Sequence, residues 1–392
     1  MNGPTATNGT QEVRISSDSH VAEPFDLWET RLPQAFRDRA LSFPDLKLGE
    51  GHHTRLGGWD PRERLKDMAF DGVSAEVLYP SLALGIFRTK DPVLAHAYSQ
   101  AYDDWMIEFC SEAPDRLWGQ AAIPLWDIDW AIGELERSRT AGLTGVTIWL
   151  VPPDELPLYS PHYERFWAAA ADLQMPVSMH INAGPPSVDG VPISQGVPSQ
   201  RQASQPSGEG RERRPQPPAR PHRNLLAAMN ALADIVGSGV LERHPRLRVV
   251  IAEVGVGWIP YWLEEEFDRR YFQGAGPRLG ALPSEYFYRQ VFATFLDDAV
   301  GGRLLSWRGA NTFMWSNDYP HERCIWPQSE ETIERILGDV SEDIRSKVLC
   351  DNVASLYGMP IPAPVQRPSE PLAGLMPSIR WHAQVPSEAG TR

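Results

Sequence analysis

The sequence predicts a (β/α)8 barrel. Eight short β-rich runs recur along the 392 residues, and most of them are separated by segments of helix length. Hydrophobic residues make up 42% of the chain, which is enough for one large core. Strands that alternate with helices favour parallel strands joined by crossover helices, and eight such units fit a closed barrel. An open doubly wound sheet is the alternative, but no Gly-rich phosphate-binding turn follows the first predicted strand.

Local patterns predict where the strands and helices lie. The eight predicted strands cover residues 13–17, 75–79, 117–123, 145–150, 176–181, 248–253, 291–295 and 312–316. The predicted helices cover residues 60–70, 91–112, 127–140, 161–173, 224–243 and 259–271. The first two helices open with Asp-Pro, a typical N-cap and first-turn pair, and the third ends before Ala141-Gly142, a typical stop signal.

Two segments interrupt the alternation. Residues 184–223 are rich in proline, serine, glutamine and arginine, which predicts a long mobile insertion after the fifth strand. Residues 360–392 are also rich in proline, and we predict an irregular C-terminal tail there. The predicted barrel therefore spans residues 13–359 and follows a disordered N-terminus at residues 1–12.

Composition excludes several classes of protein. The net charge of −14 disfavours a general nucleic-acid binder, which needs an extended basic surface. The three cysteines, Cys110, Cys324 and Cys350, lie far apart, as expected in a reducing cytoplasm. The polar N-terminus and the lack of any run of about 18 apolar residues argue against a signal peptide or a membrane span. We therefore expect a soluble cytoplasmic protein.

Metal-capable side chains stand at the ends of four predicted strands. Asp18 and His20 follow the first strand-like stretch, and residues two apart in an extended strand face the same side. His180 ends the fifth strand, Glu253 the sixth and Asp318 the eighth. Each of these residues alone could cap a helix or satisfy a turn. Together they point to one site, because the C-terminal ends of barrel strands meet at one rim.

Six stretches carry a family resemblance. They are DSHVAEP at 18–24, YPS at 79–81, MHIN at 179–182, HPRL at 244–247, EVGVGWIP at 253–260 and SNDYPH at 316–321. In these stretches the chain resembles the amidohydrolase superfamily. The resemblance is to the amidohydrolase-related group that includes the aminocarboxymuconate-semialdehyde and resorcylate decarboxylases. It extends from the start of the chain to past residue 320, excluding the insertion and the tail.

The resemblance implies a metal at the mouth of the barrel. The family's ligand positions fall on Asp18, His20, His180 and Asp318. One position departs from the pattern, because the decarboxylases usually carry a histidine for acid/base work where this chain has Glu253. A carboxylate there could activate a metal-bound water or ligate a second metal. We therefore expect one or two divalent ions, with Zn, Mn and Fe all compatible with mixed oxygen and nitrogen ligands.

Two further residues have open alternatives. Glu23 is either an additional ligand or a cap for the helix-like segment 26–30. His321 either contacts substrate or donates a proton in catalysis, or it holds a loop carbonyl. Tryptophans near strand ends either pack the core or line an apolar pocket for a bulky substrate. These are Trp149, Trp258, Trp315 and Trp326.

The insertion bears on the substrate. It carries Arg211, Arg213, Arg214, Arg220 and Arg223. This basic loop is either an unpaired flexible segment or a site for an anionic group, such as a carboxylate or the phosphates of a coenzyme A ester. We expect a small anionic substrate with an apolar part, and the resemblance and the long tail suggest a homodimer.

These observations favour a metal-dependent hydrolase of an amide, ester or thioester. Asp318, Glu253 and His321 are its expected catalytic residues, and Glu253 in place of the family's histidine motivates the choice. The alternative is a non-oxidative decarboxylase or hydratase of an aromatic or unsaturated acid. A third hypothesis is a non-catalytic binding protein on a barrel scaffold, although a barrel that has lost its catalytic activity has no need to keep all four ligands.

Overall fold

The computed structural model of the protein describes residues 12–24, 26–39, 55–184, 187–188, 191–192, 223–274, 276–321 and 324–368. The predictions for the N-terminal segment, for most of the insertion and for most of the C-terminal tail lie outside these residues. Two short antiparallel strands, β6 (Ser187–Val188) and β7 (Val191–Pro192), are described within the predicted insertion.

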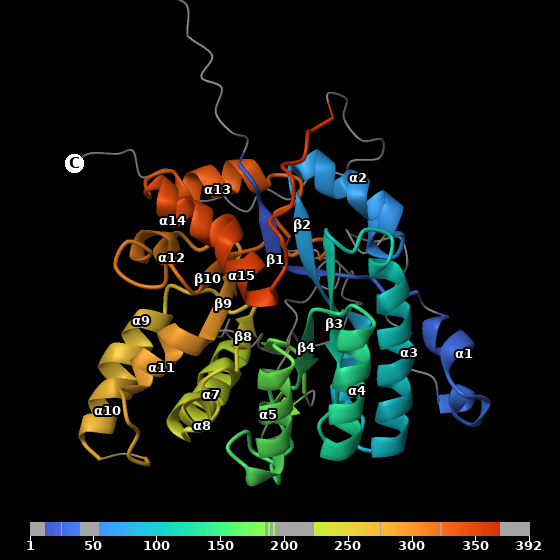
Figure 1. The fold of residues 1–392 in the computed structure, drawn as a ribbon, viewed down its shortest axis with the longest axis horizontal. Coiled ribbons are helices and arrows are strands. Elements are labelled where there is room, and N and C mark those ends of the chain that lie inside the picture. The colour runs from blue at the N-terminus through green and yellow to red at the C-terminus, as the bar shows by residue number, and fades with distance from the viewer. Residues whose placement is uncertain are drawn as a thin grey trace, which may run out of the picture.

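Eight parallel strands form the centre of the molecule (Figure 1). Their order is β1-β2-β3-β4-β5-β8-β9-β10, so each strand lies beside the next barrel strand in the sequence. They are β1 (Ile15–His20), β2 (Ala75–Tyr79), β3 (Leu117–Ala122), β4 (Gly145–Ile148), β5 (Val177–His180), β8 (Val249–Ala252), β9 (Val291–Phe295) and β10 (Phe313–Trp315). The eight predicted strands are all present, and the predicted (β/α)8 barrel is confirmed.

The first and last strands meet and nearly close the barrel. The Ser17 hydroxyl donates a hydrogen bond to the Trp315 carbonyl at 2.9 Å. The Asp318 amide donates to the Asp18 carbonyl, also at 2.9 Å. These bonds bring the segment after β10 against β1, and therefore bring Asp318 close to Asp18 although they lie far apart in the sequence.

Helices form the outer layer, with α3, α4 and α5 following one another around the strands (Figure 1). The α-helices are α1 (Leu27–Arg31), α2 (Pro61–Asp71), α3 (Pro92–Cys110), α4 (Ile128–Thr140), α5 (Glu164–Asp172), α7 (Arg223–Gly237), α8 (Val240–Arg243), α9 (Ile259–Tyr261), α10 (Arg269–Phe272), α11 (Pro283–Gln290), α12 (Ala299–Leu304), α13 (Ser329–Leu337), α14 (Glu342–Ser346) and α15 (Asn352–Tyr357). A π-helical segment, Trp262–Asp268, joins α9 to α10, and a second, Lys347–Asp351, joins α14 to α15.

Aspartates start three of these helices, and for the first two, which open with Asp-Pro, this was predicted. Asp60, Asp91 and Asp127 each accept hydrogen bonds from backbone amides two and three residues later, which satisfies amides that the first helical turn leaves free. The predicted helix 224–243 differs from the structure. It is broken between α7 and α8, because Gly239 adopts a left-handed conformation with φ 80°.

The C-terminal helices close one end of the barrel. Residues that face its interior, among them Ile15, Ala75 and Val250, pack against Val353 and Tyr357 of α15. The Asn352 side-chain amide donates to the carbonyl of Phe313, the first residue of β10, at 2.9 Å. This contact places α15 at the N-terminal ends of the strands, so the opposite end, where the strands finish, is left for the functional site.

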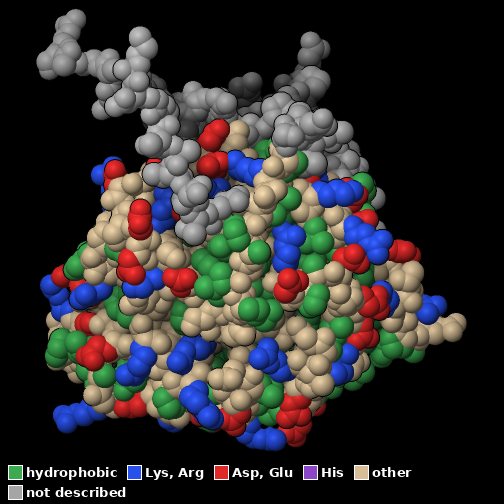
Figure 2. Space-filling view, turned by 45° about the horizontal axis from the view of Figure 1, so that its top comes forward, with side chains coloured by type: hydrophobic (Ala, Val, Ile, Leu, Met, Phe, Trp, Pro, Cys, Tyr) green, Lys and Arg blue, Asp and Glu red, His purple; other side chains and the backbone are tan. Residues whose placement is uncertain are grey.

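The surface and the hydropathy of the helices agree with the composition. Basic and acidic side chains of the described residues are interspersed over the face seen in Figure 2. Among the described residues, no helix combines the length and the apolar character that a membrane crossing needs.

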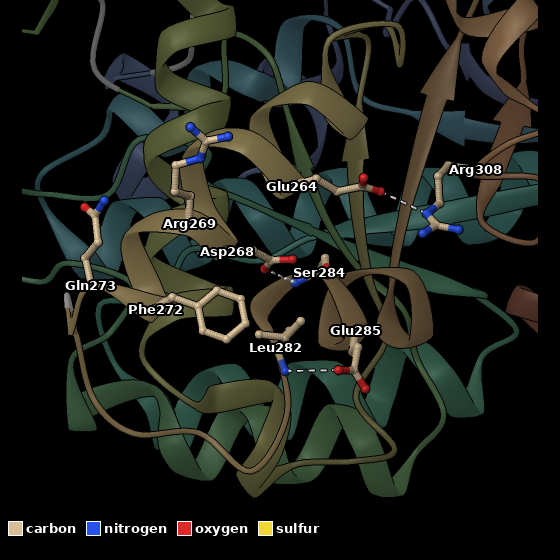
Figure 3. A pocket seen from close by; sticks show the side chains of 9 residues that line it. All are labelled: Glu264, Asp268, Arg269, Phe272, Gln273, Leu282, Ser284, Glu285 and Arg308. Carbon is tan, nitrogen blue, oxygen red and sulfur yellow. Dashed lines mark hydrogen bonds and ion pairs between the residues drawn. The ribbon is translucent and has the colours of Figure 1, made fainter.

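A hollow of about 650 Å³ lies between the α9–α10 run and α11 (Figure 3). Its Glu264 and Arg308 pair with each other at 2.9 Å, and none of its lining residues is a candidate metal ligand.

Candidate metal centre

Four segments bring the candidate ligands together where the strands finish. Asp18 and His20 both lie on β1, which runs through this pair instead of ending before it. His180 is the last residue of β5 and pairs in register with Ala252, so that the next residue, Glu253, emerges beside it. Asp318 follows β10 closely. Asp18, His20 and His180 are fully buried, whereas the Glu253 side chain is 20% exposed.

Two imidazoles face each other at the centre of the site. Nδ1 of His20 lies 2.9 Å from the Pro80 carbonyl, and Nδ1 of His180 lies 2.8 Å from the Ile181 carbonyl. A carbonyl only accepts, so both Nδ1 atoms donate, and in the neutral rings both Nε2 atoms carry lone pairs. The two Nε2 atoms are only 3.0 Å apart. Two facing lone pairs repel each other unless a positive charge lies between them.

Carboxylate oxygens surround these two nitrogens. Asp18 Oδ1 lies 3.6 Å from Nε2 of His20 and 3.5 Å from Nε2 of His180, and it is buried without a hydrogen-bond partner within the described part of the chain. Asp318 Oδ1 lies 3.6 Å from His20 Nε2, and Glu253 Oε2 lies 3.5 Å from His180 Nε2. Nitrogen and oxygen acceptors that converge in this way fit a divalent cation.

The negative charge of these carboxylates raises the pKa of His180. Burial alone would lower this pKa, but Asp18 and Glu253 together raise it to about 9. The carboxyl of Glu253 is affected in the opposite sense, because burial and the nearby Asp318 raise its pKa to about 8. The site therefore strongly favours an added positive charge.

Two overlapping groups of side chains have the spacing of metal ligands. One group is Asp18, His20 and His180. The other is His20, Glu253, Asp318 and His321. Within each group the candidate ligand atoms all lie within 4.8 Å of one another, and His20 belongs to both groups. The structure thus joins six of the seven predicted site residues into one cluster.

His321 forms the rim of the cluster. Its Nδ1 lies 2.9 Å from Asp318 Oδ1, and its Nε2 lies 3.1 Å from the Ser81 hydroxyl. Its ring stacks on the His20 ring with centroids 3.8 Å apart. Burial lowers the pKa of His321 to about 4, so its ring is neutral near neutral pH. His321 therefore braces Asp318 and His20 and reaches the surface with 20% of its side chain exposed.

Glu23 lies outside this cluster. Its two carboxylate oxygens accept hydrogen bonds from the backbone amides of Ser81, Leu82 and Ala83 at 2.8–3.0 Å. These amides begin the short 3-10 helix Leu82–Arg88, so Glu23 caps this helix and not the helix-like segment that immediately follows it. The structure brings Glu23 into neither group of candidate ligands.

Backbone strain is concentrated at the same end of the barrel. Among the described residues, four non-glycine residues have left-handed φ angles, and three of them, Asn182, Glu253 and Asp318, directly follow or closely follow a barrel strand. Their φ angles are 65°, 61° and 56°. Such conformations cost on the order of 1–3 kcal/mol each and collect at functional sites. The left-handed backbone at Glu253 and Asp318 directs both residues toward the mouth of the barrel.

Most of the tryptophans near strand ends belong to the core. Trp149, Trp315 and Trp326 are buried, whereas Trp258 is only partly buried and donates its ring N–H to the Val254 carbonyl at 3.1 Å. Four of the five arginines predicted to bind an anion lie outside the described residues, and Arg223 begins α7.

Sequence reasoning missed the residues that hold the candidate ligands in place. Thr294 of β9 contacts both Asp18 and the Glu253 backbone. Arg64 of α2 is fully buried and donates to the His20 carbonyl at 2.6 Å. Neither residue type carries a metal-binding signal. The burial of an arginine in a polar helix is visible only once the fold shows which face of the helix is covered.

The fold and the cluster define an α/β barrel protein with a candidate metal site where the strands finish. The family model described as amidohydrolase matches residues 27–359, and the chain belongs to this family. The gamma-resorcylate decarboxylase of Rhizobium sp. is 25% identical over 307 residues, which cover 74% of this chain and 85% of that protein.

Solved structures show the same fold. The 5-carboxyvanillate decarboxylase of Sphingomonas paucimobilis superposes with a TM-score of 0.66 at 20% identity, covering 89% of this chain and 99% of that one. A dihydroxybenzoic acid decarboxylase from Polaromonas sp., with bound manganese and an inhibitor, superposes with a TM-score of 0.62 at 19% identity, covering 88% and 97%.

The prediction of a hydrolase is wrong. The relatives are decarboxylases, which matches the alternative hypothesis. The prediction relied on Glu253 as a group that activates water. A carboxyl group beside a cation can equally carry a proton to carbon, so the type of residue at this position does not decide the reaction.

Proposed function

We propose that this protein is a metal-dependent, non-oxidative decarboxylase of an aromatic acid. The observation that carries the proposal is the cluster of acceptors at the barrel mouth, in a chain whose relatives are decarboxylases of phenolic acids. Asp18, His20, His180 and Asp318 are the proposed metal ligands. A single manganese ion is the proposed metal, because a Polaromonas decarboxylase of the same fold binds manganese. A divalent ion held there supplies positive charge against the carboxylate of the substrate.

Decarboxylation sets a clear task for the side chains. The bond between the carboxyl carbon and the ring carbon breaks, carbon dioxide leaves, and the electron pair stays on the ring carbon, which then takes a proton. Glu253 is the proposed proton donor, because it stands at the mouth where the decarboxylases usually carry their acid/base histidine. His321 is proposed to hold Asp318, with which it pairs at 2.9 Å. The partly buried Trp258 is proposed to contribute apolar surface for the aromatic ring.

Release of carbon dioxide from a panel of hydroxybenzoic acids tests this function. We expect the manganese-loaded protein to decarboxylate at least one acid of the panel and to lose this activity in EDTA. Glu253→Gln should lower kcat by about 10²–10⁴-fold, the usual contribution of a general acid, while manganese still binds. Glu264→Gln, in the hollow of Figure 3, is the matched control and should leave kcat unchanged.

Two outcomes would contradict the proposal. One is a manganese-loaded protein that releases no carbon dioxide from any acid of the panel. The other is a Glu253→Gln variant with wild-type kcat, which would remove Glu253 from the role of proton donor.

The homodimer and the cytoplasmic location stay predictions, which sedimentation velocity and cell fractionation can check.

A further inference from the structure

One hydroxyl group connects the two halves of the candidate site. Thr294 lies on β9, the strand between β8 and β10, and is fully buried. Its Oγ1 lies 2.9 Å from Asp18 Oδ2 and 2.8 Å from the backbone nitrogen of Glu253. Strand β9 contributes none of the clustered acidic and histidine side chains. It nevertheless touches one residue of each group.

The chemistry of the three groups fixes the direction of both hydrogen bonds. The backbone N–H of Glu253 can only donate, so the Thr294 hydroxyl accepts from it. The single hydrogen of the hydroxyl is then free for Asp18 Oδ2, which accepts it. One threonine therefore satisfies a buried amide and a buried carboxylate oxygen at the same time.

This pair of bonds determines how Asp18 is presented. With Oδ2 held by Thr294, the other oxygen, Oδ1, turns toward Nε2 of His20 and of His180, at 3.6 and 3.5 Å. Oδ1 is the buried oxygen that accepts no hydrogen bond within the described residues. The same threonine anchors Glu253 at its strained left-handed backbone position, where φ is 61°. The strand register supports the arrangement, because Ala293 pairs with Ile251 and Thr294 therefore lies level with the end of β8.

We propose that Thr294 is a positioning residue of the metal centre, which orients the Asp18 carboxylate toward the ion and holds the backbone of Glu253. The inference rests on the proposed metal site and is independent of which reaction the site catalyses. Partners that orient a ligand in this way typically change metal affinity by about 10–100-fold when they are removed.

Calorimetric titration of manganese into the metal-stripped, full-length protein tests the inference. Thr294→Val keeps the size and the branching of the side chain but can neither donate nor accept, and its dissociation constant for manganese should rise by about 10–100-fold. Thr294→Ser retains the hydroxyl and should bind manganese with an affinity close to that of the wild type.

Thr147→Val is the matched control. Thr147 lies on β4, is also fully buried, and its hydroxyl makes no hydrogen bond within the described part of the chain. The same substitution there should leave manganese affinity unchanged. Circular dichroism in EDTA establishes that each variant is folded, and Thr294→Ala replaces Thr294→Val if the valine is not accommodated.

The outcomes separate a positioning role from a merely structural one. If Thr294→Val binds manganese with wild-type affinity and has lost only stability, the inference is overturned. It is also overturned if Thr294→Ser binds manganese as weakly as Thr294→Val does. An equal loss in Thr147→Val also overturns it, because the effect would then be general to the barrel. If the wild type binds manganese but decarboxylates no acid, the proposed reaction fails, while a selective loss in Thr294→Val still supports the inference.

Discussion

At the scale of single residues, the buried guanidinium side chain of Arg64 supports the candidate metal site. The Arg64 side chain is fully buried, donates to the His20 carbonyl at 2.6 Å, and pairs with Glu76 at 2.5 Å. Its guanidinium also lies 4.5 Å from the centre of the Tyr319 ring. Arg64 thus contacts two of the four chain segments that carry candidate ligands, the end of β1 and the segment after β10.

Removing Arg64 should destabilise the protein far more than removing its exposed neighbour. Arg64→Met leaves the buried Glu76 carboxylate without its partner, which should lower the free energy of unfolding by about 3–5 kcal/mol. Arg62→Met breaks a surface pair with Glu112, in which the arginine side chain is 75% exposed, and should leave the free energy of unfolding nearly unchanged. Urea unfolding followed by circular dichroism measures both. Equal losses in the two variants would contradict the account of Arg64.

The sequence predicts which candidate ligands come together better than it predicts the residues that support them. Six residues of the candidate site were recognisable, because acidic and histidine side chains at strand ends converge in any closed parallel barrel. They are Asp18, His20, His180, Glu253, Asp318 and His321. Thr294 and Arg64 were not recognisable, because a threonine in a strand and an arginine in a helix are ordinary. The capping role of Glu23 is also a tertiary effect, since its three donors lie almost 60 residues away.

At the scale of elements, a buried aspartate joins two helices and the segment after β10 that carries Asp318. Asp71, the last residue of α2, accepts hydrogen bonds from the backbone amide of Ser329, where α13 begins, and from the side chain of Asn317. Burial raises the pKa of Asp71 to about 7 despite these bonds. The folded protein therefore retains a proton that the unfolded chain would release at a lower pH.

This raised pKa predicts a pH dependence of stability. The usual pKa of the group is 3.8, so between about pH 4 and 7 the folded state binds the additional proton, and the wild type loses stability as the pH rises through this window. Asp71→Asn does not titrate, so its free energy of unfolding relative to the wild type should rise from about pH 4 to 7 and then remain constant.

Urea unfolding across this pH range measures the effect. Asp129→Asn, at a side chain 75% exposed, is the control and should show no such slope. A difference between Asp71→Asn and the wild type that does not change with pH would contradict the account. The result would mean that Asp71 is already ionised in the folded protein at pH 4.

Element boundaries show what sequence patterns do and do not contain. Strands β2 and β9 have the predicted bounds, because buried strands of a parallel sheet are short, apolar and sharply delimited. The break at Gly239 and the π-helical segment Trp262–Asp268 were not predicted. The break follows from the left-handed backbone of Gly239, and neither it nor the π-helical segment is specified by the hydrophobic pattern of a segment.

At the scale of the whole molecule, the two ends of the barrel have different tasks. The end where strands begin is filled by α15, which packs on the interior residues of the barrel. The end where strands finish carries the acidic and histidine cluster and three strained residues. The alternation of strands and helices predicted the barrel, whereas the plug formed by α15 was not predicted, because a six-residue helix carries no sequence signal of the surface that it packs against.

The central claim is that one divalent ion binds where β1, β5 and β10 finish. A crystal structure of the manganese-loaded protein, with anomalous scattering recorded at the manganese edge, tests this claim most directly. The account predicts one anomalous peak within about 2.0–2.3 Å of Asp18 Oδ1 and of Nε2 of both His20 and His180, with Asp318 beside it. A peak elsewhere, or none in a crystal soaked with manganese, would contradict it.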